Sequence, residues 1–317
     1  MPEIKYDMIT VLGPTATGKT RLAAGIAATL NGEIISADSR QVYKDMDIGT
    51  GKDYKDYIID DVSVPYHLID ITDAGNEYNL HQYQQDFYQV FEQVINKRKI
   101  PVLCGGSGLY LESVLNGYNL LTVPVNDKLR KELEHKSDDE LSSILASLRP
   151  LHNTTDITNR KRAVRAIEIE MYSKEHPALK KSKPTITSIN FGFNYPREIL
   201  RERIEKRLHS RLKQGMVDEI DKLVKSGVPT EQLINYGLEY KFVTMFLLGK
   251  LEYDEMVEKL FIAICQFAKR QMTWFRKMER NGTVIHWINW RLKDHEKIEN
   301  ALSEIGIKTK NKNNICG

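Results

Sequence analysis

The chain has 317 residues, of which 41% are hydrophobic and 28% are charged, so it is long enough for one large or two modest domains with a hydrophobic core. This composition excludes a disordered or fibrous protein, and the mean hydropathy of −0.44 with no long apolar run excludes a membrane-spanning helix. The first residues lack the basic and apolar regions of a signal peptide, so we expect a soluble cytoplasmic protein with no membrane partner.

The charge distribution and the cysteine content narrow the class of protein further. The net charge of +3 hides an asymmetry, because residues 1–124 carry 10 Lys and Arg against 16 Asp and Glu, whereas the rest carry 36 against 27. The excess of basic residues after residue 124 suits a polyanionic partner such as nucleic acid, although solvated basic helices have the same composition. The three cysteines, Cys104, Cys265 and Cys316, are widely separated and odd in number, which argues against both a disulfide framework and a CxxC zinc site.

Strands alternate with helices over the first 120 or so residues. Met8–Leu12 is a short apolar run rich in β-branched residues, and the apolar positions of Thr20–Leu30 have helical spacing. Two more strands are expected at Glu33–Ala37 and Ile100–Cys104, with a crossover helix over Leu80–Lys99 between them. This alternation predicts a parallel α/β sheet.

From about residue 125 the pattern becomes helical and highly charged. Helices are expected at Asp127–His135, Asp138–Leu148 and Asn159–Tyr172, followed by a linker at Lys180–Pro184 and a strand over Thr185–Phe193. We therefore predict a helical insertion domain at 122–184 between two parts of one α/β core, 1–121 and 185–317.

The last third of the chain is predicted to be mainly helical. Helices are expected from Pro196 through Gly227 and from Tyr253 through Glu279, and Val284–Ile288 can form a short edge strand. The tail Lys308–Gly317 has the composition of a disordered segment.

The first motif follows the first strand and reads Gly13-Pro14-Thr15-Ala16-Thr17-Gly18-Lys19-Thr20, which fits GxxxxGK[ST]. In such a loop the backbone N–H groups form an anion site, the lysine reaches phosphate oxygens, and the Ser/Thr hydroxyl ligates Mg²⁺. The alternative is an ordinary glycine turn, but the flanking strand and helix favour a phosphate loop. The sequence thus predicts a P-loop NTPase-like core that binds a diphosphate group, which need not belong to ATP.

Two further polar loops follow the second and third strands. Asp38, in Asp38-Ser39-Arg40-Gln41, can hold Mg²⁺ through water, act as a general base, or cap a helix. Ser107, in Gly105-Gly106-Ser107-Gly108, can donate a hydrogen bond to a phosphate oxygen or a leaving group. Because the carboxyl ends of parallel strands meet at one edge of the sheet, we expect these loops to share an active-site rim with the phosphate loop.

Three basic stretches are candidates for anion contacts, each with a solvated surface or a packed helix as the alternative. Arg203 and Arg207 are four positions apart and share a helix face, from which Arg207 can meet a diphosphate. Arg160-Lys161-Arg162-Ala163-Val164-Arg165 places four cations on the insertion, which suits phosphate contacts with RNA. Lys269–Arg276 interleaves cations with aromatic residues, and we expect Phe267, Trp274 and Phe275 to be mostly core.

Taken in order, GPTATGKT, ADSRQVYKDMDIGT, GGSGLYLESVLNG, NRKRAVRAIEI and AKRQMTWFR resemble the tRNA dimethylallyltransferases, also called tRNA isopentenyltransferases. The resemblance spans about residues 8 to 290. It implies transfer of a dimethylallyl group from dimethylallyl diphosphate to N6 of adenine 37 in tRNAs that read codons beginning with U, with Mg²⁺ as cofactor, by an enzyme that we expect to be monomeric.

The resemblance also implies roles for particular residues. The loop Gly13–Thr20, with Lys19, Arg207 and Mg²⁺ on Thr20, would bind the diphosphate; Asp38 would take the proton from the exocyclic amine; and Ser107 would orient the diphosphate or bridging oxygen. The implied tRNA contacts are Asp38, Ser39, Arg40, Gln41, Lys161, Arg162, Ala163, Val164, Arg165, Tyr240 and Lys241, with the insertion gripping the anticodon stem-loop.

At three positions the chain departs from the family pattern. Glu239 stands where a glycine usually precedes the Tyr-Lys pair, Asp53 stands where a proline usually follows GTGK, and Ser107 replaces the usual threonine. None of these changes removes a group that the chemistry needs.

Three other functions use the same motifs. A small-molecule kinase would pair the phosphate loop with an aspartate base, and an adenylate isopentenyltransferase would prenylate free AMP, ADP or ATP. Neither needs the cations at 161–165. A noncatalytic RNA-binding protein would not need Asp38 and Ser107 at strand ends.

Overall fold

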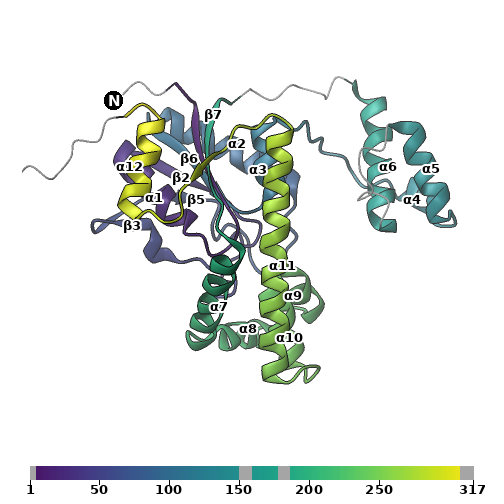
Figure 1. The fold of residues 1–317 in the computed structure, drawn as a ribbon. Helices are drawn as coiled ribbons and strands as arrows, with labels where there is room; N and C mark the ends of the chain where they lie inside the picture. The colour runs from purple at the N-terminus through teal and green to yellow at the C-terminus, as the bar shows by residue number, and fades with distance from the viewer. Residues whose placement is uncertain (1–4, 150–158, 178–185, 308–317) are drawn as a thin grey trace, which may run out of the picture. The chain divides into compact units, whose positions relative to one another are not determined.

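The computed structural model describes residues 5–149, 159–177 and 186–307 (Figure 1). The chain divides into two compact units, one formed by Met1–Asn116 with Ile186–Gly317 and the other by Gly117–Thr185. The predicted linker Lys180–Pro184 and the tail Lys308–Gly317 lie outside the described residues. Within the described ranges, every helix is too short or too polar to cross a membrane.

A six-stranded sheet forms the centre of the first unit. Its order is β5-β2-β6-β1-β7-β8, and every neighbouring pair is parallel. The strands are β1 (Met8–Leu12), β2 (Gly32–Ala37), β5 (Tyr66–His67), β6 (Ile100–Gly105), β7 (Ser188–Phe193) and β8 (His286–Ile288). The predicted parallel α/β sheet is therefore confirmed, and the predicted short edge strand, β8, is at the edge. β3 (Ile58–Ile59) and β4 (Val62–Ser63) form a separate antiparallel pair.

Helices cover both faces of the sheet, because the central strands are apolar on both sides. On one face Ile9 and Ile34 pack with α1 (Lys19–Leu30) and α12 (Asp294–Glu304). On the other face Met8 and Ile35 pack with α2 (Leu80–Asn96), α3 (Gly108–Leu115) and the C-terminal part of α11 (Tyr253–Arg280).

A helical layer follows β7 and lies beyond the ends of the strands (Figure 1). It consists of α7 (Arg197–Lys213), α8 (Met216–Lys225), α9 (Thr230–Tyr236), α10 (Leu238–Leu247) and the N-terminal part of α11. The aliphatic and aromatic side chains of these helices join the same core cluster as α1. This layer places basic residues of α7 and aromatic residues of α11 opposite the loops at the strand ends.

The second unit has its own small core. It contains α4 (Asp127–Leu133), α5 (Asp138–Leu148) and α6 (Arg160–Glu175), so each helix predicted in the insertion is present. Leucines of α4 and α5 pack against Ala163 and Ile167 of α6. Buried Glu168 accepts hydrogen bonds from Arg130 and Arg165, and these bonds lower the pKa of its carboxyl to about 2.

Several elements differ from the prediction. The strand expected over Thr185–Phe193 begins only at Ser188, and the helix expected to reach Lys99 ends at Asn96, because Arg98 has a φ of 55° and turns the chain into β6. Two-residue strands such as β5 and a 3-10 turn at Tyr54–Tyr57 carry too few residues for periodicity to reveal them. Helices α9, α10 and α12 were also not predicted.

Candidate active site

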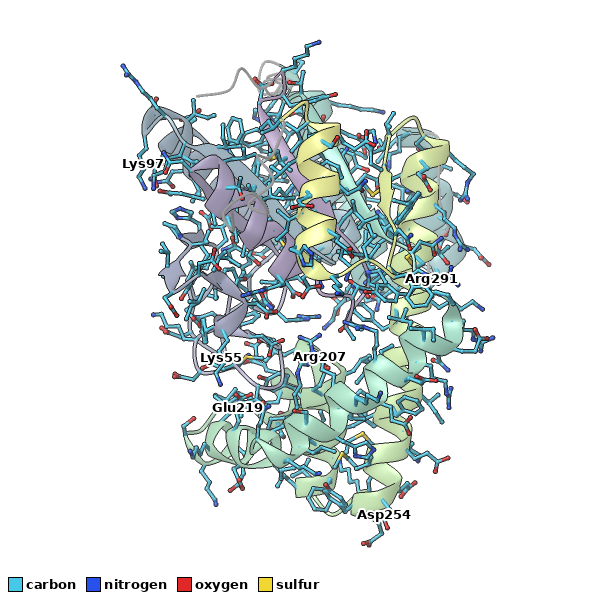
Figure 2. The ribbon with its side chains drawn as sticks, turned by 60° about the vertical axis from the view of Figure 1, so that its left-hand side comes forward. Lys55, Lys97, Arg207, Glu219, Asp254 and Arg291 are labelled. Carbon is cyan, nitrogen blue, oxygen red and sulfur yellow. The ribbon has the colours of Figure 1, made fainter. Side chains whose placement is uncertain are left out.

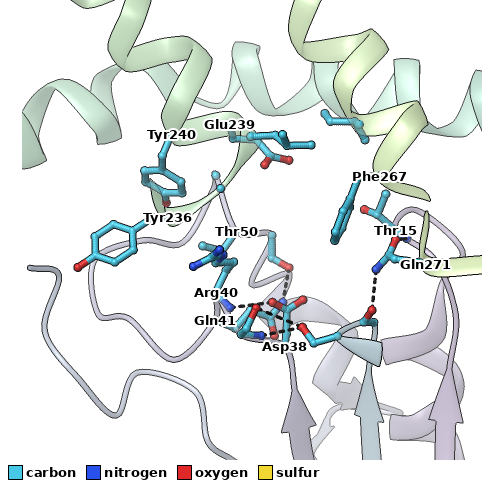
Figure 3. A pocket seen from close by; sticks show the side chains of 18 of the residues that line it. Thr15, Asp38, Arg40, Gln41, Thr50, Tyr236, Glu239, Tyr240, Phe267 and Gln271 are labelled. Atoms are coloured by element: carbon cyan, nitrogen blue, oxygen red, sulfur yellow. Dashed lines mark hydrogen bonds between the residues drawn. The ribbon is translucent and has the colours of Figure 1, made fainter. Parts of the chain in front are cut away.

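A cavity of about 660 Å³ opens at the carboxyl ends of β1, β2 and β6, between the sheet and the helical layer (Figures 2 and 3). The phosphate loop, the Asp38–Gln41 segment and the Gly106–Ser107 turn all line it. Residues of α7, α9, α10 and α11 form the opposite wall. The structure therefore brings together the three strand-end loops that the sequence predicted to share a rim.

The phosphate loop has a bent, pre-formed conformation. Gly18 and Ala16 adopt left-handed backbone angles, with φ of 83° and 63°, and the Thr17 hydroxyl donates to the Pro14 carbonyl at 2.8 Å. Burial lowers the pKa of Lys19, and the nearby Arg207 and Arg211 lower it further. No carboxylate within the described ranges forms an ion pair with Lys19. The loop thus presents a half-buried cation without a fixed counter-ion among the described residues, which suits an anionic ligand.

Two arginines of α7 hold this loop. Arg203 Nε donates to the Ala16 carbonyl at 2.7 Å, and Arg207 Nη1 donates to Thr15 Oγ1 at 3.0 Å. Arg207 Nη2 also pairs with Asp53 Oδ2 at 2.8 Å. Figure 2 shows Arg207 where the helical layer meets the sheet. The predicted common face of the two arginines is confirmed, and the alternative of a solvated Arg207 is wrong.

Gln271 of α11, which the sequence analysis did not single out, joins two of the loops. Its Oε1 accepts from the Thr15 N–H at 3.0 Å, and its Nε2 donates to the Gly106 carbonyl at 2.9 Å. A Cβ at position 106 would lie 2.5 Å from Gln271 Nε2, so a larger residue there would displace the Gln271 amide. This residue lies inside the AKRQMTWFR stretch, but its two backbone partners are not recognisable from the sequence.

Asp38 and Ser107 lie at neighbouring strand ends. Asp38 Oδ1 accepts from the Arg40 N–H at 3.0 Å, and no helix follows, so the helix-cap interpretation of Asp38 is wrong. Ser107 Oγ accepts from the Ser39 N–H at 3.0 Å and lies 3.3 Å from Ser39 Oγ. These bonds connect the glycine turn at Gly106–Ser107 to the Asp38–Gln41 segment. Asp38 itself lines the cavity.

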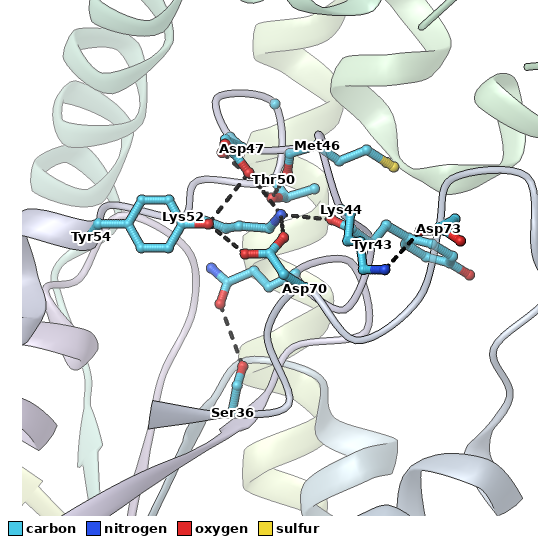
Figure 4. Close-up of polar contacts among 12 residues, drawn as sticks. Ser36, Tyr43, Lys44, Met46, Asp47, Thr50, Lys52, Tyr54, Asp70 and Asp73 are labelled. Carbon is cyan, nitrogen blue, oxygen red and sulfur yellow. Dashed lines mark hydrogen bonds and ion pairs between the residues drawn. The ribbon is translucent and has the colours of Figure 1, made fainter. Parts of the chain in front are cut away.

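A polar network fixes the loop that continues from this segment (Figure 4). Buried Lys52 donates to the Tyr43 carbonyl at 2.6 Å and to Asp47 at 2.8 Å, and it also pairs with Asp70. The Glu219 carboxylate of α8 accepts from three consecutive backbone N–H groups, those of Asp47, Ile48 and Gly49. The network positions Gly49–Gly51 as one side of the cavity.

Aromatic side chains of α11 form another side. Phe275 is fully buried, as predicted, but Phe267 is 40% exposed, and it lines the cavity together with Trp274. The expectation that these aromatics are mostly core is therefore wrong for Phe267, whereas Trp274 is partly buried and packs against the same core cluster as Phe275. The reason is that α11 runs along the cavity, so successive faces of one helix meet the core and the open space.

The basic residues of the insertion fall into two groups. Arg160 donates to carbonyls at the end of α4, and Arg165 pairs with Glu168 and donates to the Val123 carbonyl at 2.7 Å. Lys161 and Arg162 are exposed, and their side chains have no hydrogen-bond or ion-pair partner among the described residues. Ala163 is core. Of the four cations at Arg160–Arg165, all within the described residues, only Lys161 and Arg162 therefore have side chains ready to contact a phosphate backbone.

Tyr240 and Lys241 also have different environments. Tyr240 is 1% exposed and donates to Glu219 Oε1 at 2.8 Å, whereas Lys241 is exposed. The tRNA contact of Tyr240 stays a prediction, since the residue lines the cavity while its hydroxyl belongs to the Glu219 network. Arg40 lines the cavity beside Gln41, whose amide donates to the Gly51 carbonyl at 3.0 Å.

The described residues contain no cluster of three His, Cys, Asp or Glu side chains able to hold a metal ion by themselves. A Mg²⁺ site of another kind fits the cavity, since Mg²⁺ commonly takes one or two protein oxygens, water and phosphate oxygens of a substrate. Thr20 lines the cavity next to Lys19, and its hydroxyl can supply such an oxygen.

The model of the family described as IPP transferase matches residues 41–278, and that described as isopentenyl transferase matches residues 6–62. A protein of Phocaeicola vulgatus named tRNA dimethylallyltransferase 2 is 54% identical over 96% of this chain and 99% of its own length. Solved tRNA isopentenylpyrophosphate transferases of Staphylococcus epidermidis and Bacillus halodurans are 30% and 29% identical, with TM-scores of 0.66 and 0.69. They cover 94% and 95% of this chain, and this chain covers 98% and 96% of theirs. The match in motifs, length and fold identifies the chain as a member of the IPP transferase family, the family of the tRNA dimethylallyltransferases.

Proposed function

We propose that the protein transfers a dimethylallyl group from dimethylallyl diphosphate to N6 of adenine 37 in tRNAs that read codons beginning with U, and releases diphosphate. The observation that supports this most directly is the shared cavity, which is lined both by the phosphate loop, whose Lys19 has no ion-pair partner among the described residues, and by Asp38 at the end of β2. The donor's diphosphate occupies the loop Gly13–Thr20, with Lys19 and Arg207 balancing its charge. Since the acceptor is a tRNA, the cytoplasm is the expected compartment.

In the proposed reaction N6 of adenine attacks the allylic carbon, the carbon–oxygen bond to diphosphate breaks, and Asp38 takes the proton lost by the amine. A positioned base is needed because the lone pair of an exocyclic amine is delocalised into the ring. Ser107 orients the diphosphate or the bridging oxygen. Mg²⁺, held by Thr20 and the diphosphate, would supply positive charge to the leaving group.

The acceptor base must leave the anticodon-loop stack to reach this cavity. We assign Asp38–Gln41 and Lys241 to the cavity side of the tRNA interface, where Phe267 and Trp274 provide surfaces on which bases can stack. Lys161 and Arg162 of the second unit are the proposed phosphate contacts on the anticodon stem-loop. Their exposure, and their lack of partners among the described residues, support this role.

The test is incubation of the purified protein with Mg²⁺ and labelled dimethylallyl diphosphate, with unmodified tRNA, AMP or ATP as the acceptor. Label in tRNA alone is the expected result, and mapping should place it at adenine 37. Label in AMP or ATP would instead favour adenylate prenylation, and the isopentenyl transferase match over residues 6–62 makes that comparison worthwhile. Phosphoryl transfer from ATP without prenylation would favour a kinase.

A further inference from the structure

Arg211, one turn after Arg207 on α7, is a buried cation with unsatisfied hydrogen-bond donors. It is 7% exposed, and its Nε and Nη2 have no hydrogen-bond partner in the part of the chain that the structure describes. Burial and the charge of Arg207 lower the pKa of its guanidinium to about 10. Since buried polar groups are normally hydrogen-bonded, unsatisfied donors on a charged group suggest that a ligand is needed to complete the site.

The guanidinium of Arg211 lies against the phosphate-binding side of the cavity. A Cβ placed on Gly51 would lie 1.6 Å from Arg211 Nη2 and 2.5 Å from Arg207 Nη2, so both arginines converge on the same glycine. A smaller recess joins Arg207 and Arg211 to Thr15 and Ala16 of the phosphate loop. Arg211 therefore adds a third cation to a site that already contains Lys19 and Arg207.

Two carboxylates lie near this guanidinium at distances too long for hydrogen bonds. Asp53 Oδ2 is 3.9 Å from Arg211 Nη2, and Glu239 Oε1 is 3.7 Å from Arg211 Nη1. Burial raises the pKa of Glu239, while Arg211 opposes this shift. The two arginines and two carboxylates give a group with no net formal charge while no anion is bound.

Asp53 and Glu239 are two of the positions at which this chain departs from the family pattern, where proline and glycine are usual. The structure brings both departures to one side chain, although they are 186 positions apart in the sequence. The departures thus make sense as a set, since Glu239 places a carboxylate near Arg211, and Asp53 places one near both Arg211 and Arg207, with which it pairs at 2.8 Å.

We propose that Arg211 is a second diphosphate-binding arginine, and that Asp53 and Glu239 act as its counter-ions until the diphosphate binds. The inference rests on the proposed function, since it concerns the same phosphate site. Binding of a diphosphate gives Nε and Nη2 of Arg211 the acceptors that they lack, in the bidentate geometry that guanidinium groups favour. The carboxylates then limit the affinity for the diphosphate product, because they compete with it for the arginine.

The alternative is that Arg211 serves only to neutralise Glu239. The double variant R211M/E239Q separates the two roles, because it removes both charges of the pair together. If Arg211 only neutralises Glu239, R211M/E239Q binds inorganic diphosphate as the wild type does. If Arg211 binds the ligand, the double variant stays weak.

The experiment measures binding of inorganic diphosphate with Mg²⁺ by titration calorimetry on the full-length wild type, R211M, E239Q and R211M/E239Q. We expect R211M and R211M/E239Q to bind about tenfold or more weakly, the scale of a lost charged hydrogen bond. We expect E239Q to bind several-fold more tightly, because one competing carboxylate has been removed. A thermal unfolding curve for each variant confirms that it is folded, and the double variant remains informative if R211M alone does not fold.

Wild-type affinity in R211M/E239Q would overturn the role of Arg211 while leaving the proposed function intact. The titration of the wild-type protein tests the proposed function separately. If the wild-type protein bound no diphosphate, both proposals would be wrong. In steady-state kinetics we expect the double variant to have a higher KM for dimethylallyl diphosphate than the wild type, with a smaller change in the KM for tRNA.

Discussion

The side chain of Gln271 accepts a hydrogen bond from the backbone N–H of Thr15 at 3.0 Å, although the two residues are 256 positions apart. The same amide donates to the Gly106 carbonyl at 2.9 Å. One residue of α11 therefore sets the distance between the phosphate loop and the glycine turn. This explains why a helix far from the phosphate loop in sequence belongs to the site.

The variant Q271M is expected to raise the KM for dimethylallyl diphosphate about tenfold, because it leaves the Thr15 N–H and the Gly106 carbonyl without partners and loosens the loop. Steady-state kinetics with varied donor provides the measurement. T273A is the matched control on the same helix, since the exposed hydroxyl of Thr273 bonds, within the described ranges, only to the Lys269 carbonyl. Equal kinetics for Q271M and wild type would show that the bridge does not position the loop.

Replacement of Asp38 by asparagine should lower turnover by about 10²-fold or more, the usual scale for a lost general base. An asparagine keeps the shape of the residue and can still accept from the Arg40 N–H, so the loop should remain in place. Single-turnover prenylation measures the chemical step, and a tRNA-binding assay should show little change in affinity, because asparagine keeps an oxygen that can accept a hydrogen bond from the RNA. Turnover close to wild type would remove Asp38 from the mechanism.

We expect charge reversal to have different effects at the exposed and at the paired cations of α6. R162E should weaken tRNA binding and flatten its salt dependence without changing the unfolding temperature, because Arg162 is exposed. R165E should destabilise the second unit, because it breaks the pair with Glu168. Filter binding over a range of salt concentrations and thermal unfolding separate the two effects. Normal tRNA affinity in R162E would argue against this surface as an RNA contact.

The free energy of unfolding of the second unit should fall at acid pH, because Glu168 becomes protonated. Its pKa in the folded protein, about 2, is below the ordinary 4.5, so its stabilising contribution is fully present above pH 4.5 and disappears as the pH falls toward 2. This gap corresponds to at most about 3 kcal/mol, reduced by the partial exposure of Arg130 and Arg165.

Hydrogen exchange of peptides from α4 and α6, corrected for intrinsic rates, would measure this effect. Wild-type protection should fall between pH 5 and pH 3, whereas E168Q should start lower and change less. E33Q is the control, since Glu33 in β2 also has a carboxyl pKa of about 2 but belongs to the first unit. A pH response in α4 and α6 that E33Q removes and E168Q does not would contradict the assignment.

The sequence by itself determined the features that depend on local pattern. The strand–loop–helix around Gly13–Thr20, the parallel sheet, the helices of the insertion and the shared face of Arg203 and Arg207 all follow from periodicity and spacing over a few neighbouring residues. The meeting of Asp38 and Ser107 with the phosphate loop also follows, because parallel strands end at a common edge.

Only the tertiary structure decided which side chains complete the site. Gln271, Asp53 and Arg211 reach the phosphate loop or its arginines from other segments, and no local pattern marks such contacts. The structure also separated residues that look alike in sequence, since Arg162 is exposed while Arg165 is bound to Glu168. The physical reason is that burial and partner choice depend on packing between segments far apart in the chain, whereas periodicity reports only one helix or strand at a time.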